Sequence, residues 1–269
     1  MKTVQLEQSE FGGVLPLYRA AGACFPLISA VIHNGQRGQV FADDRQRPTS
    51  SVVVTHFGFM LFLGVEENDP FNSGLAGLFA TGGFKPSYLL WYSPPANWQR
   101  RLEAVGHDLV RRRERVRLEF EPEHAGWLTN PDQCPAGFEL KSLSSDLISE
   151  TKKFGVKIES RFWASAADFL EHGLGVCLLK DDDVVSICYA AAIADGLAEV
   201  DVATDAEFRG RGLASVAAQR FIRDCLQRQV LPTWDCFEDN TASLKLALKL
   251  GFVPARNYAL YSFHVPAKV

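Results

Sequence analysis

Seven residues, Phe208-Arg209-Gly210-Arg211-Gly212-Leu213-Ala214, join a strand-like segment to a helix-like segment. Residues 198–204 alternate as a strand does, whereas residues 212–228 repeat apolar side chains at helical spacing. Glycine at such a turn lets the backbone curl around an anion, and the first N–H groups of the helix point at it. With two arginines in the turn, the sequence predicts an α/β fold in which this loop binds a pyrophosphate.

The spacing of the glycines excludes two common phosphate-binding loops. The dinucleotide-binding pattern G-x-G-x-x-G would need glycine at position 215, which is Ser215. The pattern G-x-x-x-x-G-K-[ST] is absent from the chain. A tight strand-to-helix connection without a ligand remains an alternative on these residues alone.

The residues around the turn resemble a known family. Arg209, Gly212 and Ala214 meet the pattern R-x-x-G-x-A, and the stretches 199–204 and 240–252 stand at matching spacing. Together they resemble the acetyl-CoA signature of the GNAT N-acetyltransferases, over about residues 137–265. The resemblance implies an enzyme with a mixed-sheet α/β fold and acetyl-CoA as its cosubstrate, with no metal.

The resemblance also implies which residues contact acetyl-CoA. The backbone after the third strand would align the acetyl-pantetheine arm like an added strand. The loop amides would hold the pyrophosphate, and the start of the later helix would touch the arm. The expected contacts are Val202, Ala203, Thr204, Arg209, Gly210, Arg211, Gly212, Leu213, Ala214, Asn240 and Ser243.

The reaction requires a neutral amine, so a base or a proton wire must deprotonate the substrate ammonium. Asp235 is one candidate, because its position matches a catalytic glutamate of the protein-alanine acetyltransferases by resemblance. Glu199 and Asp201 are the others, and a period of two places them on one face of a strand. Water alone is a further possibility, and acidic residues on a sheet face are often only ion-paired.

The expected proton donor to the leaving thiolate is missing. Many members of the family carry tyrosine where this chain has Ala247. Tyr258, Tyr261 or water could replace it, or the thiolate could leave unprotonated, since a thiol of this kind has a pKa of about 8.5.

The whole chain resembles the zwittermicin A resistance protein group of GNAT acetyltransferases. The matching stretches include residues 26–32, 38–43, 173–178, 199–201 and 234–236. We therefore expect two domains, 1–130 and 137–269, separated by a stretch rich in proline and glycine. The second reads as ααβββαβαβ, and the first as a divergent acetyltransferase-like domain of order βββαβαβ. The first domain is expected to be substrate-shaping or structural. Within it, residues 28–32 and 39–42 are predicted to form a hairpin around Asn34-Gly35.

Composition excludes several other function classes. A net charge of −4 argues against nucleic-acid and membrane-surface binding, and Arg111 to Arg115 are interpreted as the solvated start of a strand. The six cysteines form no C-x-x-C pair, and the six histidines show no metal-ligand spacing. With neither a signal peptide nor a membrane span visible, we expect buried thiols in a reducing cytoplasm.

The sequence thus predicts transfer of an acetyl group to a primary amine of a small molecule, such as an antibiotic or an amino-sugar or peptide-like metabolite. Two alternatives stay open: a non-catalytic acyl-CoA sensor, and an acyltransferase that uses a longer acyl chain. Neither the acceptor nor the oligomeric state follows from the sequence.

Overall fold

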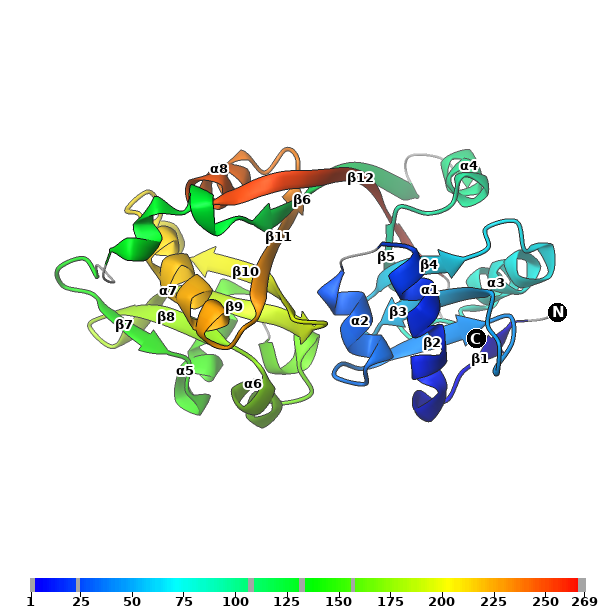
Figure 1. The fold of residues 1–269 in the computed structure, drawn as a ribbon, viewed down its shortest axis with the longest axis horizontal. Coiled ribbons are helices and arrows are strands. Elements are labelled where there is room, and N and C mark those ends of the chain that lie inside the picture. Colours follow the sequence, from blue (N-terminus) through cyan, green and yellow to red (C-terminus); the bar gives the residue numbers. More distant parts are fainter. Residues whose placement is uncertain (1–2, 23–24, 106–108, 131–133, 156–157, 266–269) are drawn as a thin grey trace. The chain divides into compact units, whose positions relative to one another are not determined.

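The computed structural model describes residues 3–22, 25–105, 109–130, 134–155 and 158–265. The chain forms two compact units, Met1–Glu114 with Tyr258–Val269 (unit 1) and Arg115–Asn257 (unit 2). It passes from one unit to the other twice, within β6 (Val110–Phe120) and within β12 (Phe252–His264). Figure 1 shows the elements of both units.

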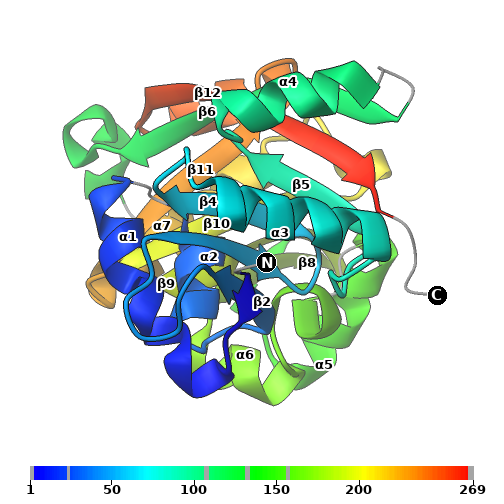
Figure 2. The same cartoon turned by 90° about the vertical axis from the view of Figure 1, so that its right-hand side faces the viewer.

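Unit 1 is a sheet of strand order β1-β2-β3-β4-β5-β12 with helices on its faces. All its neighbouring strands that have a stated register run antiparallel except β4 and β5, which are parallel. Phe71 and Leu75 of α3 pack into the core against β3 and β4, and α2 also contacts these strands; Figure 2 views this unit. The elements are β1 (Val4–Gln5), α1 (Leu15–Ala20), α2 (Pro26–Ile32), β2 (Gly38–Ala42), β3 (Ser50–Thr55), β4 (Phe59–Gly64), α3 (Asp69–Thr81), β5 (Tyr88–Tyr92) and α4 (Ala96–Val105).

The predicted hairpin around Asn34-Gly35 is wrong, because residues 28–32 belong to the helix α2. Pro26 opens this helix, where its missing N–H costs nothing and its fixed φ suits a helix. Every residue of α2 is buried, including Ser29, so no polar face marks its period in the sequence. Asn34 does adopt a left-handed conformation with φ 63°, but it turns the chain from α2 toward β2.

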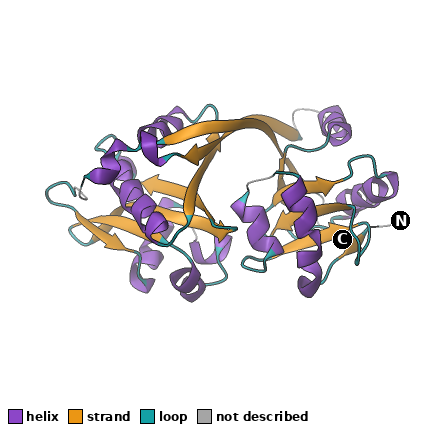
Figure 3. Ribbon diagram, viewed as in Figure 1, coloured by secondary structure: helices purple, strands orange, loops and turns teal. Residues whose placement is uncertain are grey.

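Unit 2 has the strand order β7-β8-β9-β10-β11-β6. The helix α7 packs against β8 to β11. Figure 3 distinguishes the helices from the strands of the fold by colour. The elements are β7 (Glu139–Ser142), α5 (Ser145–Glu150), η5 (Ile158–Phe162), α6 (Ala166–His172), β8 (Gly175–Lys180), β9 (Asp183–Ala194), β10 (Leu197–Thr204), η6 (Ala206–Phe208), α7 (Leu213–Gln227), β11 (Leu231–Phe237) and α8 (Thr241–Lys249). The remaining short helices are η1 (Gln8–Val14), η2 (Pro122–His124), η3 (Gly126–Thr129) and η4 (Thr151–Phe154).

The two halves of the chain repeat one order of elements. The series from β1 to β6 and the series from β7 to β12 both read βααβββαβαβ when the short η helices are set aside. Each half gives its last strand to the other unit: β12 pairs with β5, and β6 pairs with β11. The boundary therefore lies within β6, before the predicted break at residues 131–136, and residues 258–265 belong to unit 1. Strand alternation cannot reveal this, since it does not identify the sheet that a strand joins.

The sheet of unit 2 has one apolar face and one partly polar face where β6, β11 and β10 lie. Ala198 and Val200 of β10 join Trp234 of β11 and Leu118 of β6 in a core with α7 and α8. The alternate residues of the same strands point to the opposite face. The candidate carboxylates lie there.

Candidate functional site

The glycine-rich loop lies between β10 and α7, as predicted. Gly210 and Gly212 have φ of 75° and 80°, a region that side chains with a Cβ rarely adopt. A Cβ at either glycine would meet no atom within 4 Å. The conformation, rather than crowding, therefore requires glycine, and the surface of the loop stays open.

A row of N–H groups at the start of α7 lacks acceptors within the helix. Gly212 is the N-cap and offers no side-chain oxygen to the helix. The amides of Ser215 and Val216 bond to the carbonyl of Gly212, but those of residues 210–214 have no acceptor among the described residues. Unpaired N–H groups at a helix start form an anion-binding site, so this loop suits a pyrophosphate.

The two arginines of the loop are exposed and are oriented by nearby backbone oxygens. The Nε of Arg209 donates to the carbonyl of Thr204 at 3.2 Å. The Nη2 of Arg211 donates to the carbonyl of Glu207 at 3.2 Å, and its guanidinium lies 5.0 Å from the centre of the Phe208 ring. Both positive charges thus stay beside the amides of the loop.

The corresponding connection of unit 1, which is fully described, does not repeat this anion site. This connection, between β4 and α3, contains Glu66 and Glu67 and no arginine. Asn68 caps α3 by accepting from the amide of Phe71, and Asp69 lies in the first turn. Three carboxylates near this helix start would repel a pyrophosphate.

Strands β10 and β11 separate next to the loop. Their parallel pairing joins residues 197–199 to residues 231–233 and goes no further. Beyond that point β10 continues against β9 alone, and β11 continues against β6 alone. A bulge in the β9–β10 ladder between Glu199 and Val200 marks the same place, and bulges bend strands. The facing edges of residues 200–204 and 234–237 thus carry no strand partner within the described part of the chain.

The register shows which backbone groups point toward this open edge. The amide of Asp205 donates to the carbonyl of Val185, on the β9 side. Backbone groups alternate sides along a strand, so those of Ala203 also face β9, while those of Val202 and Thr204 face away from it. Of the three residues expected to align an acetyl-pantetheine arm, Val202 and Thr204 present their backbone to the open edge.

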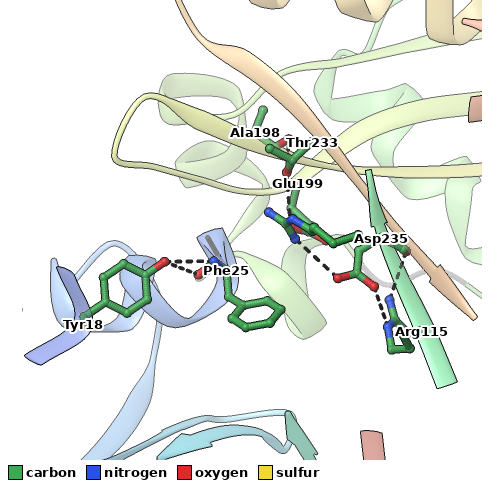
Figure 4. Close-up of polar contacts among 8 residues, drawn as sticks. Tyr18, Phe25, Arg115, Ala198, Glu199, Thr233 and Asp235 are labelled. Carbon is green, nitrogen blue, oxygen red and sulfur yellow. Dashed lines mark hydrogen bonds and ion pairs between the residues drawn. The ribbon is translucent and has the colours of Figure 1, made fainter. Parts of the chain in front are cut away.

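Two of the three candidate carboxylates are ion-paired to arginines of β6. Nη1 of Arg117 lies 2.9 Å from Oε2 of Glu199 and 3.4 Å from Oδ2 of Asp235. Nε of Arg115 lies 2.5 Å from Oδ1 of Asp235 (Figure 4). Burial raises the pKa of Glu199, and Arg117 opposes that effect. Both oxygens of Asp235 are therefore engaged by guanidinium groups, which suits a counter-ion better than a base.

The third carboxylate has a different environment. Oδ2 of Asp201 accepts a hydrogen bond of 2.6 Å from the hydroxyl of Tyr189, its direct cross-strand neighbour on β9. Burial raises the pKa of Asp201, and this hydrogen bond lowers it. Glu199 and Asp201 share one face, as the period of two predicts, but a salt bridge to arginine is found only for Glu199 among the described residues.

The start of α8 is occupied by contacts within the protein. The side chain of Asn240 caps the helix by accepting from the amide of Ser243 at 3.2 Å. The Ser243 hydroxyl in turn accepts from Nε1 of Trp234 at 2.9 Å. Ala247 is completely buried in the core of unit 2. The roles of Asn240 and Ser243 toward acetyl-CoA remain predictions.

The two tyrosines considered as proton donors belong to unit 1. The Tyr261 hydroxyl donates to Oε1 of Glu103 at 2.7 Å, and its pKa is raised by burial and by that carboxylate. Tyr258 is buried and lies edge-on to the ring of Phe25.

Three residues of the polar face were not predicted from sequence. Arg115 was interpreted as part of a solvated strand start, but its side chain is only 12% exposed and holds Asp235. Arg117 and Tyr189 are buried and were not singled out. Their alternation with core residues on β6 and β9 was the only available signal.

Other predicted features concern metals, membranes and thiols. Within the described ranges, no group of three or more metal-ligating side chains is present, and no helix is long and apolar enough to span a membrane. Cys177, Cys188, Cys225 and Cys236 are buried free thiols, whereas Cys134 is exposed. Cys24 lies outside the described residues.

Comparisons with known proteins agree over nearly the whole chain. The profile of the family described as GNAT acetyltransferase matches residues 22–261. An uncharacterized N-acetyltransferase of Bacillus subtilis, YdfB, is 29% identical over 238 residues, which are 88% of this chain and 90% of that protein.

Solved structures share the fold. A GNAT-like protein from Streptococcus suis superposes with a TM-score of 0.72 at 24% identity, covering 96% of this chain and all of that one. A tandem GNAT protein from the clavulanic acid biosynthesis pathway gives a TM-score of 0.67 at 12% identity, covering 99% of this chain and all of that one.

Proposed function

The chain belongs to the GNAT acetyltransferase family, and we propose that this enzyme moves an acetyl group from acetyl-CoA to a primary amine of a small molecule by direct attack. Acetyl-CoA supplies the activated acyl group. The protein supplies the position of both substrates and the path for the proton of the amine. We place the enzyme in the cytoplasm, where acetyl-CoA is available and thiols stay reduced.

One observation supports the cofactor assignment above all others: the open edge of β10 is followed in the chain by the start of α7, which has no side-chain cap. Val202 and Thr204 present backbone groups at that edge, as an added strand requires. Residues 210–214 present N–H groups where a pyrophosphate would lie, and the side chains of Arg209 and Arg211 add positive charge beside them. The two features are contiguous in the chain, which fits an elongated ligand with an anionic group partway along it.

Asp201 is the carboxylate best suited to accept the proton of the substrate ammonium. Its pKa is raised by burial, which makes it a stronger base than an exposed aspartate. Glu199 and Asp235 are held by Arg117 and Arg115, so we propose that they fix the geometry of β10 and β11 instead. The leaving thiolate takes its proton from water in this scheme.

The acceptor is a cationic small molecule with a primary amine. The proposal rests on the buried carboxylates of the polar face and on the resemblance to the zwittermicin A resistance group, whose implied acceptors are antibiotics of amino-sugar or peptide-like character. The β4–α3 connection of unit 1 does not repeat the glycine-rich loop, so we propose that this unit shapes the acceptor site or supports the fold.

The test is release of free CoA thiol with a panel of amines at neutral pH. The panel contains amino-sugar antibiotics, peptide-like antibiotics and simple primary amines, and each is run with acetyl-CoA and with longer acyl-CoAs. Turnover that prefers acetyl-CoA with a primary amine supports the proposal. A folded enzyme that binds CoA but releases no thiol with any amine would argue for a binding module.

Variants of the loop separate binding from chemistry. Arg209→Ala should weaken acetyl-CoA binding measured by calorimetry, because it removes a charge beside the exposed amides. Arg113→Ala on β6, an arginine outside the loop, is the matched control and should bind normally. Equal affinity of the Arg209 variant and the wild type would remove the loop from the site.

A further inference from the structure

We propose that Tyr189 is a positioning residue that holds Asp201 as the ionised base of the acyl transfer. The inference rests on the proposed function, and it concerns a residue to which neither the sequence pattern nor the comparisons assign a role. It depends on three features: the geometry of the pair, the charges around it, and the proton that each group carries.

The geometry fixes the carboxylate in one orientation. Tyr189 and Asp201 are directly opposite on β9 and β10, and the hydroxyl donates to Oδ2 at 2.6 Å. Tyr189 is fully buried, with its ring centre 6.1 Å from that of Phe162 in η5. A rigid ring between two packed elements cannot follow a rotating carboxylate, so the hydrogen bond selects a single rotamer of Asp201.

The position of the pair is equally informative. Asp201 lies two residues beyond Glu199, where β10 and β11 have already separated. It directly precedes Val202, whose backbone groups face the open edge of β10. A base at this point stands next to the arm that an added strand would bring in, whereas Glu199 lies at the closed end.

The charges around Asp201 come from several elements. Arg161 of η5 and Arg115 of β6 favour its ionised form, as does the amide of Val202 on its own strand. Cys188 of β9 is a buried neighbour, and burial raises the pKa of its thiol well above the ordinary value. Glu199 of the same strand and Asp235 of β11 are paired with Arg117, so the Tyr189 hydroxyl is the side-chain hydrogen bond that opposes burial at Asp201.

The proton balance assigns distinct roles to the two groups. The N–H bond of the substrate ammonium breaks and an O–H bond forms on Asp201. The neutral amine then forms a C–N bond to the acetyl carbonyl carbon, the C–S bond of the thioester breaks, and the second amine proton passes through water to the leaving thiolate. Burial and the adjacent carboxylate raise the pKa of Tyr189 well above its ordinary value, so its hydroxyl keeps its proton throughout. Tyr189 therefore acts only through Asp201, and its loss should change the pH at which Asp201 is ionised.

The experiment compares pH profiles of kcat/KM for the wild type, Tyr189→Phe and Asp201→Asn. Tyr189→Phe removes the hydrogen bond but keeps the ring. The acid limb of its profile should move to higher pH by about one unit or more, with activity recovering at the alkaline end. Tyr88→Phe, which removes an exposed tyrosine hydroxyl in unit 1, is the matched control and should leave the profile unchanged.

The outcomes separate this inference from the proposed function. Wild-type enzyme that releases no CoA thiol with any amine defeats the function itself. Wild-type turnover with an unshifted acid limb in Tyr189→Phe overturns the inference alone. Calorimetric affinity for acetyl-CoA shows whether each variant is folded. In the double variant Tyr189→Phe/Asp201→Asn, the tyrosine change should add nothing to the loss caused by Asp201→Asn, and independent, multiplying losses would also overturn it.

Discussion

Replacing Arg117 by methionine should destabilise the protein by about 3–5 kcal/mol, the usual result of removing one partner of a buried ion pair. The Arg117 side chain is 3% exposed, and it contacts Glu199 from β10 and Asp235 from β11. Asp235 would keep Arg115, so the uncompensated charge falls on Glu199. We therefore expect a value near 3 kcal/mol, the lower end of the range.

The loss should depend on pH in a defined direction. The pKa of Glu199 is already raised in the folded protein, and removing Arg117 raises it further, because that guanidinium favours the ionised form. A carboxyl with a raised folded pKa contributes stability below its unfolded pKa, and that contribution is lost as pH rises through the folded pKa. The variant should therefore be nearest to the wild type at acidic pH and weakest at neutral pH.

Urea unfolding followed by circular dichroism, from pH 5 to pH 8, measures both effects. Arg117→Met/Glu199→Gln should recover most of the loss at neutral pH, because no buried charge is then unpaired. Arg111→Met is the matched control, since it removes an exposed arginine from the same strand and should cost within about 0.5 kcal/mol. If Arg117→Met costs no more than this control, or if Glu199→Gln restores nothing, the ion pair does not organise β10 and β11.

Gly212→Ala should lower the free energy of unfolding in urea by about 1–2 kcal/mol and weaken acetyl-CoA binding, because the φ of Gly212 is positive. A Cβ there would meet no atom within 4 Å, so strain alone causes the loss. Gly126→Ala is the control: Gly126 is equally uncrowded but has no positive φ, so neither stability nor binding should change. Gly251→Ala should lower the free energy of unfolding more than Gly212→Ala does. Gly251 also has a positive φ, and a Cβ there would in addition lie 2.8 Å from the Cβ of Ala125. Equal losses of stability in the two variants would contradict the reasoning. Asp201→Asn should abolish most turnover. At neutral pH the variant should be as stable as the wild type or more stable, because burial raises the pKa of the native carboxyl and its ionisation there costs stability. A less stable variant would count against this assignment.

The sequence predicts best what short segments decide by themselves. The helix expected over residues 212–228 is α7 (Leu213–Gln227), and the later helix expected within the stretch 240–252 is α8 (Thr241–Lys249). Each has one apolar face. The helix α2 was missed because it is buried on all sides and contains β-branched residues, a pattern shared with a buried strand.

The site is less predictable because its polar groups meet over long sequence separations. The partner of Glu199 is Arg117, which lies 82 positions earlier on a strand that belongs to the other half of the repeat. The exchange of β6 and β12 makes that contact, and no local pattern encodes the exchange. The loop, by contrast, consists of consecutive residues, so its position between a strand and a helix could be predicted from the local sequence.

The most direct test of the account is a crystal structure of the protein with CoA bound. The account predicts the pyrophosphate within hydrogen-bonding distance of the amides of residues 210–214, and the pantetheine arm bonded to the backbone of Val202 and Thr204. It also predicts that the sulfur lies nearer to Asp201 than to Asp235. A pyrophosphate bound at the start of α3, or an arm that leaves the edge of β10 unpaired, would contradict the central claim.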